Sequence, residues 1–137
     1  MELKSVSVEI GGRTMTFETG VMAKQADGSV VVRMDDSAVL VTAVTGGPAR
    51  LDFLPLTVEY QDRNGAYGTI TGNYFKREGR SNERETLVSR MIDRPIRPQF
   101  PKHYRNETQV IGTVLSYDEG CDTDTLACNA AFPSPYF

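Results

Sequence analysis

The sequence has few of the residues that bind zinc or form disulfides. Its 137 residues include two cysteines and one histidine. Cys121 and Cys128 are seven positions apart, and neither has a ligand-like spacing with His103. This spacing argues against a zinc site and against a disulfide framework. Reduced thiols of this kind are typical of a cytosolic protein.

No apolar run approaches the roughly 20 residues that a membrane-spanning helix needs. The N-terminus, residues 1–6, has neither the apolar core of a secretory signal nor the Arg- and Ser-rich pattern of a transit peptide. Internal repeats and low-complexity segments are absent as well. We therefore expect a cytoplasmic protein without a membrane partner.

Three motifs of nucleotide binding and catalysis are also missing: G-x-x-x-x-G-K-[ST], G-x-G-x-x-G and G-x-S-x-G. His103 lies in a proline-flanked basic stretch, where we expect it to be exposed. The acidic pairs Asp35-Asp36 and Asp122/Asp124 could bind a divalent ion. Turn and helix-cap roles explain the same pairs more simply. The sequence therefore predicts no catalytic residue and no metal ligand in this chain.

What is present is a globular composition, 39% hydrophobic and 24% charged, in a chain long enough to bury a core. The charge is unevenly distributed. Residues 63–105 contain ten of the fifteen lysines and arginines but four of the eighteen acids, so this segment carries +6 and the remainder −9. A basic segment in an acidic chain favours a polyanionic partner. A solvated charged face would give the same composition.

The first sixty residues have the alternation of β-structure. Residues 6–10 and 14–17 alternate apolar and polar side chains on either side of a glycine pair. Two β-branched runs, 29–34 and 38–44, are joined by residues whose Asp and Ser side chains suit a turn, which predicts a hairpin. The second run is apolar on both faces, so we expect it to be a central, buried strand.

Two more strands and a long loop are predicted further along. Residues 54–60 form a strand pattern, with Pro55 near its start or on a sheet edge. Residues 61–79 are polar and glycine-rich, which indicates an irregular loop, and loops of this length are usually functional or disordered. Residues 108–117 read as another buried strand.

Two helices are expected in the second half. Asn82 and Glu85 have the spacing of a capping box, and Pro95 is expected to end the helix that they begin. The residues expected to form its apolar stripe are Leu87, Val88, Met91 and Ile92. The acidic stretch 122–125 could start a second, short helix that reaches Ala131.

A glycine-flanked loop combines two adjacent aromatics, Tyr74 and Phe75, with three cations, Lys76, Arg77 and Arg80. Single-stranded nucleic acid is bound by such a combination, because bases stack on the rings and phosphates pair with the cations. Each stacked base contributes roughly 1–3 kcal/mol. The alternative is that the two aromatics anchor the loop in the core.

Arg90 and Arg94 lie one helical turn apart and share a face of the predicted helix. Asp93 and Glu83 are near enough in sequence to pair with them, so a structural ion-pair network is an alternative to phosphate binding. Together with the loop, however, the two arginines can form one basic stripe, as expected of an RNA-binding surface.

Several stretches resemble the first RNase PH-like core of the polynucleotide phosphorylases: residues 75–80, 85–87, 89–98 and 100–101. Flanking features that also agree are Gly28, Asp35-Asp36, Asp62-Arg63 and Asn106. The resemblance implies an α+β fold, an incomplete RNase PH-like core with a mixed, largely antiparallel sheet and a packed helix. We expect residues 1–131 to form the N-terminal portion of that core. Residues 132–137 depart from the family and are expected to be an atypical tail, from a truncation or a frame-shift.

The resemblance also implies an activity. The family degrades RNA from its 3′ end by phosphorolysis, in mRNA turnover, with inorganic phosphate as co-substrate and nucleoside diphosphates as products. Its members are homotrimers that use Mg²⁺, and the phosphate- and metal-dependent chemistry lies mainly in a second core. The first core contributes RNA contacts, which by motif match are Tyr74, Phe75, Lys76, Arg77, Arg80, Arg90, Arg94 and Arg97. This chain alone is therefore expected to be inactive.

One departure concerns the loop, because the family usually has Phe-Phe-Arg-Arg where this chain has Tyr74-Phe75-Lys76-Arg77. Tyrosine stacks as phenylalanine does, but lysine binds phosphate as a point charge rather than as a two-pronged fork.

Two other functions remain open. One is a noncatalytic RNA-binding or scaffold subunit of an exosome-like ring; the other is a single-core, tRNA-trimming RNase PH, which residues 75–80 and 93–98 fit less well.

Overall fold

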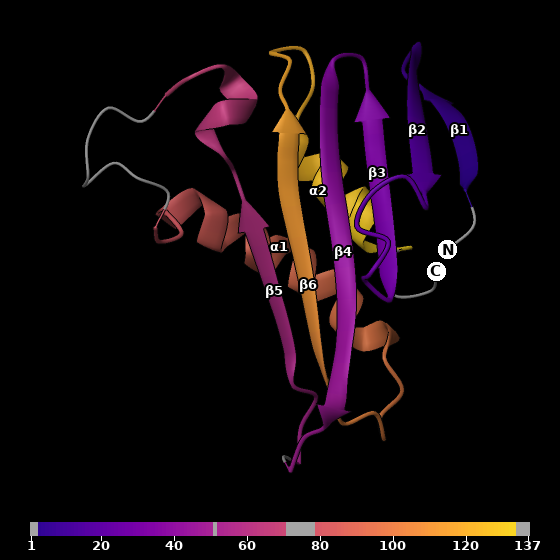
Figure 1. Cartoon of the computed structure of the whole chain (residues 1–137), viewed down its shortest axis with the longest axis vertical. Coiled ribbons are helices and arrows are strands. Elements are labelled where there is room, and N and C mark those ends of the chain that lie inside the picture. The colour runs from indigo at the N-terminus through magenta and orange to yellow at the C-terminus, as the bar shows by residue number, and fades with distance from the viewer. Residues whose placement is uncertain (1–2, 51, 71–78, 134–137) are drawn as a thin grey trace.

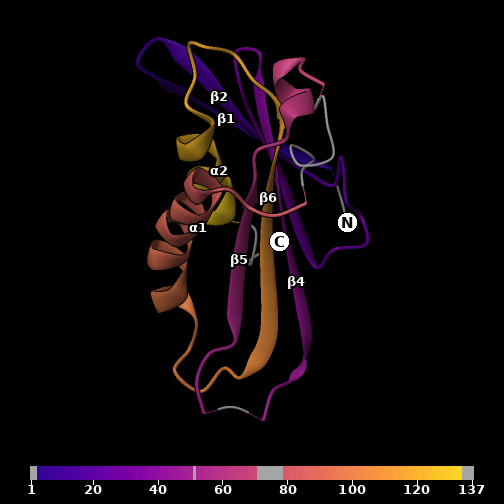
Figure 2. The same cartoon turned by 90° about the vertical axis from the view of Figure 1, so that its left-hand side faces the viewer.

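The computed structural model describes residues 3–50, 52–70 and 79–133. One six-stranded sheet carries both α-helices on the same face, as Figures 1 and 2 show. The strands are β1 (Lys4–Ile10), β2 (Arg13–Thr19), β3 (Gly28–Met34), β4 (Ser37–Pro48), β5 (Leu56–Gln61) and β6 (Asn106–Ser116). The helices are η1 (Asn64–Tyr67), α1 (Glu83–Ile96), η3 (Arg97–Gln99) and α2 (Thr123–Ala131).

The first four strands form an antiparallel meander, which confirms the predicted β3–β4 hairpin and also pairs the two alternating runs on either side of the glycine pair. Gly11 and Gly12 turn the chain between β1 and β2 with φ of 59° and 77°. Two successive positive φ angles suit a tight hairpin turn, and glycine adopts them without steric cost. Asp35, at φ 52°, turns the chain between β3 and β4, where aspartate tolerates the left-handed region.

The strand order is β1-β2-β3-β4-β6-β5, so β6 enters the sheet between β4 and β5. All pairs are antiparallel except β5 with β6. A parallel pair needs a crossover connection, and α1 provides it. β4 is a central strand with a buried first half, as predicted, and β5 is an edge strand with Pro55 just before it.

The second half confirms the helix starts but corrects the end of α1. The Asn82–Glu85 capping box is present, and Asp122 caps α2 by accepting the Thr125 N–H. Pro95 was expected to end α1, yet the helix continues to Ile96 and then tightens into η3. Proline lacks an N–H and crowds the preceding turn, but it leaves the following N–H groups free to bond. The Arg97 N–H still donates to the Asp93 carbonyl, and Ile96 is buried in the core.

The predicted apolar stripe of α1 is half wrong. Val88, Ile92 and Ile96 are buried, whereas Leu87 and Met91 are 59% and 46% exposed. Positions 88, 92 and 96 form one line along an α-helix, while 87 and 91 lie about 100° around it. The sheet and α2 cover the line of positions 88, 92 and 96, and the opposite side of α1 faces solvent (Figure 2).

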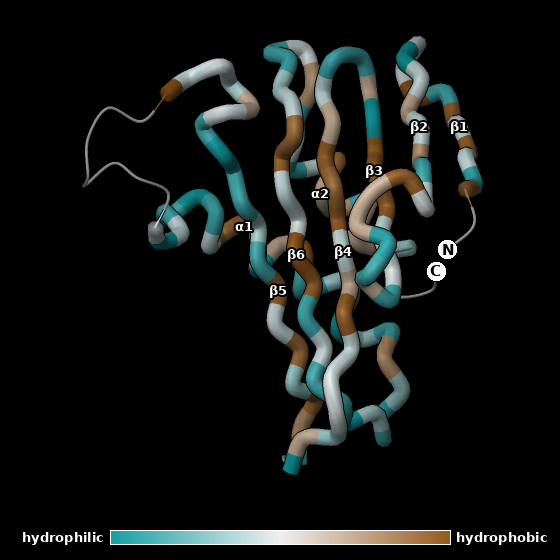
Figure 3. Tube along the Cα trace, viewed as in Figure 1, coloured by the Kyte–Doolittle hydropathy of each residue, from teal (hydrophilic) through white to brown (hydrophobic). Residues whose placement is uncertain are grey.

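The core lies between the sheet and the helices. Figure 3 shows hydrophobic residues concentrated on β3, β4 and β6, where α2 packs. The predicted loop at 61–79 contains the single turn η1, and its residues 71–78 lie outside the described part of the chain, as do residues 134–137 of the predicted tail. Within the described ranges, no helix is long and apolar enough to cross a membrane.

Candidate nucleic-acid interface

Arg90 and Arg94 project from the solvent side of α1. Both are exposed, and among the described residues neither side chain has an ion-pair or hydrogen-bond partner. Asp93, which could have neutralised them, pairs instead with Arg97. Among the described residues, the ion-pair network therefore does not include these two arginines.

Unlike Arg90 and Arg94, Arg97 is bonded to other residues of the fold. Its guanidinium bonds the Asp93 carboxylate at 2.8 and 3.0 Å, and it also donates to the Leu54 and Leu56 carbonyls at 3.3 and 3.1 Å. These bonds tie the end of α1 to the start of β5. The side chain is still 44% exposed, so its contact with RNA stays a prediction, but its first role is structural.

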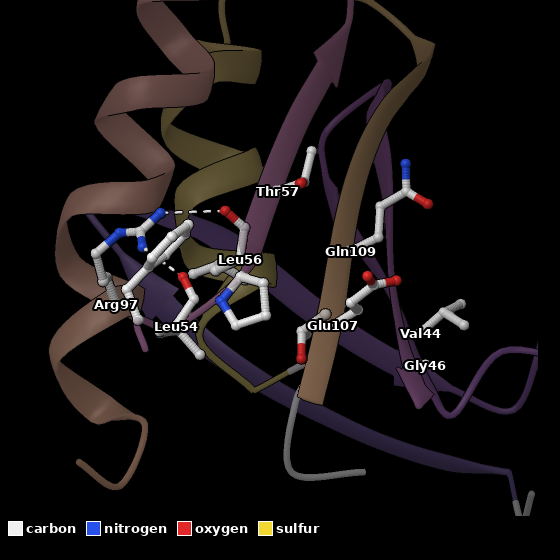
Figure 4. A pocket seen from close by; sticks show the side chains of 11 residues that line it. Val44, Gly46, Leu54, Leu56, Thr57, Arg97, Glu107 and Gln109 are labelled. Carbon is white, nitrogen blue, oxygen red and sulfur yellow. Dashed lines mark hydrogen bonds between the residues drawn. The ribbon is translucent and has the colours of Figure 1, made fainter. Parts of the chain in front are cut away.

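A cavity of about 650 Å³ lies beside Arg97. Figure 4 shows Arg97 bonding Leu54 and Leu56 on one side of it, with Glu107 and Gln109 on the other. The arginine there is already paired, and Glu107 would repel a phosphate. This cavity therefore does not suit a polyanion.

Arg80 is exposed and lies two residues before the N-cap of α1. The chain thus places Arg80 near the start of the helix whose outer side carries Arg90 and Arg94. The remaining predicted RNA contacts, Tyr74, Phe75, Lys76 and Arg77, lie outside the described residues, so their stacking role and the alternative loop-anchor role both stay predictions.

The start of α1 adjoins a polar cluster that the sequence did not reveal. The Tyr60 hydroxyl bonds the Thr123 hydroxyl at 3.1 Å, and Arg84 pairs with Asp124 at 3.1 Å. Burial raises the pKa of Tyr67 to about 12, and the Asp62 carboxylate adds to this shift. Burial also raises the pKa of Tyr60. The residues are far apart in sequence, so no spacing pattern could have predicted the cluster.

These two tyrosines predict a loss of stability in alkali. Both have folded-state pKa values above the ordinary 10.0, so the folded chain holds protons that the unfolded chain releases. The free energy of unfolding should be insensitive to these groups below about pH 10 and should fall as the pH rises beyond it. Urea titrations across this range will measure the slope. In Tyr67→Phe the slope should be shallower, and an unchanged slope would contradict the prediction.

The acidic pairs have structural roles. Asp35 pairs with Arg13 at 3.4 Å, Asp122 caps α2, and Asp124 pairs with Arg84. Over the described ranges, no three His, Cys, Asp or Glu side chains gather closely enough to hold a metal ion. His103 is exposed, as expected. Asp35 lies in the β3–β4 turn and Asp122 caps α2, which agrees with the turn and cap interpretation for these two acids.

Residues 11–133 match the 3′ exoribonuclease family, domain 1. The chain is 56% identical over 129 residues to the polyribonucleotide nucleotidyltransferase of Nitrobacter hamburgensis, which covers 93% of this chain and 18% of that protein. The corresponding protein of Rhodopseudomonas palustris (strain HaA2) is 57% identical over the same shares of both chains. The chain thus spans less than a fifth of the length of these relatives.

Two solved structures share the fold. One is an Archaeoglobus fulgidus exosome with RNA bound to the active site, at TM-score 0.66 and 19% identity, covering 97% of this chain and 51% of that one. The other is rice Rrp46, at TM-score 0.63 and 17% identity, covering 89% and 53%. The sheet with its two helices is therefore an RNase PH-like α+β core, as expected, and the chain belongs to the 3′ exoribonuclease family.

Proposed function

We propose that this chain is the RNA-guiding part of a 3′–5′ exoribonuclease that degrades RNA by phosphorolysis. An oxygen of inorganic phosphate would attack the terminal phosphodiester, releasing a nucleoside diphosphate and leaving a shortened RNA with a free 3′ hydroxyl. The family match and the names of the relatives support the reaction class. The observation that carries the RNA-guiding role is the exposed, unpaired state of Arg90 and Arg94 among the described residues.

The outer side of α1 has the chemistry that single-stranded RNA requires. Two guanidinium groups one turn apart can each pair with a phosphate, and arginine does so with a two-pronged geometry. Arg80, two residues before the N-cap of the helix, extends the positive charge along the chain toward the aromatic-basic loop. In that loop, Tyr74 and Phe75 are proposed to stack on bases while Lys76 and Arg77 pair with phosphates.

The catalytic groups are proposed to lie outside this chain. Asp35, Asp122 and Asp124 are engaged in a cap and in ion pairs, and within the described ranges no three His, Cys, Asp or Glu side chains are close enough together to hold Mg²⁺. The relatives are much longer than this chain. Magnesium and the phosphate co-substrate would act in the part of the enzyme that this chain does not cover. We further propose a homotrimer in the cytoplasm that acts in mRNA turnover, with other RNA-degrading proteins as possible partners.

Binding of fluorescent single-stranded RNA tests the proposal. We expect the chain to bind RNA with an affinity that falls with salt, and Tyr74→Ala/Phe75→Ala/Arg77→Ala to lose at least tenfold, since each stacked base alone contributes about 1–3 kcal/mol. The control is Lys24→Ala, an exposed cation in the β2–β3 connection. That connection crosses the face of the sheet opposite to α1 (Figure 2).

Equal binding by the triple variant and the wild-type chain would contradict an RNA contact in the loop. A separate assay addresses catalysis: the purified chain should release no nucleoside diphosphate from RNA in the presence of phosphate and Mg²⁺. Phosphate-dependent release would show that catalytic groups lie in this chain after all.

A further inference from the structure

β5 is at one end of the sheet, and its outer side is the edge that α1 lies along. Every second residue of an edge strand turns its N–H and C=O away from the sheet, and such groups are a template for pairing with another strand. The carbonyl of Pro55 faces β6, because it accepts the Thr108 N–H at 3.0 Å. The outward-facing positions are therefore the alternate ones from 54 to 62.

Two outward N–H groups, at the end of β5 and just after it, donate to side chains of α1. The Tyr60 N–H donates to the Ser89 hydroxyl at 2.9 Å, and the Asp62 N–H donates to Glu85 Oε1 at 2.8 Å. The Ser89 hydroxyl in turn donates to the Glu85 carbonyl at 2.7 Å, which fixes its orientation. Glu85 is buried and Ser89 is half-buried, so both acceptors lie between the helix and the strand.

Two outward carbonyls at the beginning of β5 accept from the same helix side. Arg97 donates to the carbonyls of Leu54 and Leu56 at 3.3 and 3.1 Å (Figure 4). Asp93, four residues earlier, holds the guanidinium with bonds of 2.8 and 3.0 Å. Helix side chains thus bond backbone groups near both ends of this edge.

The four side chains form one line along α1, at positions 85, 89, 93 and 97. The helix runs opposite to β5, because later residues of the line bond earlier residues of the strand. Four residues of an α-helix advance about 6 Å, and two residues of a strand advance about 6.6 Å. The line therefore keeps pace with the alternate, outward-facing residues of β5 from one end of the strand to the other.

We propose that this polar line of Glu85, Ser89, Asp93 and Arg97 protects the edge of β5 from pairing with β5 of a second copy of this chain. Identical edges pair around a two-fold axis, so each copy carries the complementary surface. Such pairing requires α1 to move away from the edge, and the bonds of the polar line oppose that movement. The inference concerns assembly and does not depend on the proposed RNA function.

The variant Ser89→Ala/Arg97→Ala removes bonds from both ends of the edge. Thr86→Ala is the matched control, since the Thr86 hydroxyl also donates to the carbonyl four residues earlier, that of Asn82. The Thr86 side chain is exposed, whereas Ser89 in addition accepts a strand N–H. Both variants therefore lose a helix hydroxyl, but only the first loses partners of β5.

Amide hydrogen exchange, followed by NMR, measures the bond at Tyr60. In Ser89→Ala the Tyr60 N–H should exchange about tenfold faster than in the wild-type chain, the effect of losing one hydrogen bond. In Thr86→Ala its exchange should change by less than about threefold, as for a surface substitution. An unchanged rate in Ser89→Ala would show that the Ser89 hydroxyl does not hold this edge.

Sedimentation velocity at several protein concentrations measures assembly. Ser89→Ala/Arg97→Ala should self-associate at a concentration about tenfold lower than the wild-type chain or Thr86→Ala, because its edge has lost bonds that oppose pairing. Adding Thr57→Lys should reverse this change. Thr57 is an exposed residue of β5, and charged side chains on an edge strand disfavour strand pairing.

Two results would overturn the proposal. One is a Ser89→Ala/Arg97→Ala variant that assembles no more readily than the wild-type chain. The other is stronger assembly that Thr57→Lys leaves unchanged, since the contact would then lie away from β5. If circular dichroism shows that the double variant does not fold, Ser89→Ala alone replaces it in the assembly measurement. None of these results bears on RNA binding, so the proposed function is tested separately.

Discussion

Replacing Ile92 with alanine is expected to lower the free energy of unfolding by about 2–5 kcal/mol. The side chain is 1% exposed and lies in the core between α1 and the sheet. The substitution leaves a cavity there, because β5 and α2 hold the surrounding residues in place. Urea denaturation followed by circular dichroism will measure the change.

The matched control is Met91→Ala, the neighbouring position on the same helix. Met91 is 46% exposed, so its truncation should change the free energy of unfolding by less than about 1 kcal/mol. Leu87→Ala, at 59% exposure, should behave similarly. If Met91→Ala and Ile92→Ala were equally destabilising, both sides of α1 would have to be buried in solution, and the exposed basic face would have to be abandoned.

Removing Arg90 and Arg94 together is expected to weaken RNA binding and to reduce its dependence on salt. If each arginine neutralises one phosphate of a single strand, the slope of log affinity against log salt should decrease in magnitude by about 1.4. The stability of the fold should not change, because among described residues neither side chain has a partner. Fluorescence anisotropy at several salt concentrations will give the slope.

Arg97→Ala serves as the contrasting variant. Arg97 bonds Asp93 and the carbonyls of Leu54, which precedes β5, and Leu56, its first residue, so its loss should lower the free energy of unfolding. If Arg90→Ala/Arg94→Ala bound RNA with the wild-type affinity and salt slope, the outer side of α1 would not be the RNA path. A salt slope reduced by Arg97→Ala would in turn show that Arg97 has a second role.

The features that the sequence predicted correctly depend on neighbours in the chain. The β1–β2 and β3–β4 hairpins follow from alternation and from turn residues within a few positions. The capping box depends on a three-residue spacing, and Asp122 caps α2 in the same way. Hydrogen bonds of this kind form within one turn or one hairpin, so a short window of sequence contains all the partners.

The candidate site was predictable only in part. Composition and motif spacing were enough to select Arg80, Arg90 and Arg94, which the structure leaves exposed. They were not enough to distinguish Arg97, which is bonded within the fold, from the arginines that are not. Its partners Leu54 and Leu56 are more than forty residues away in the sequence. The charge of an arginine is visible in the sequence, but whether that charge is already satisfied depends on which carbonyls the fold brings to it.

The sequence by itself determined the elements of this protein: the strands, the helix starts, the basic segment and the family pattern that joins them. Tertiary structure alone decided which line of α1 is buried, since Leu87 and Ile92 are equally apolar and only the position of the sheet distinguishes them. It also decided that Glu85 bonds Asp62 as well as Asn82. Burial and long-range hydrogen bonds depend on how distant segments pack, and no short window of the chain contains both partners.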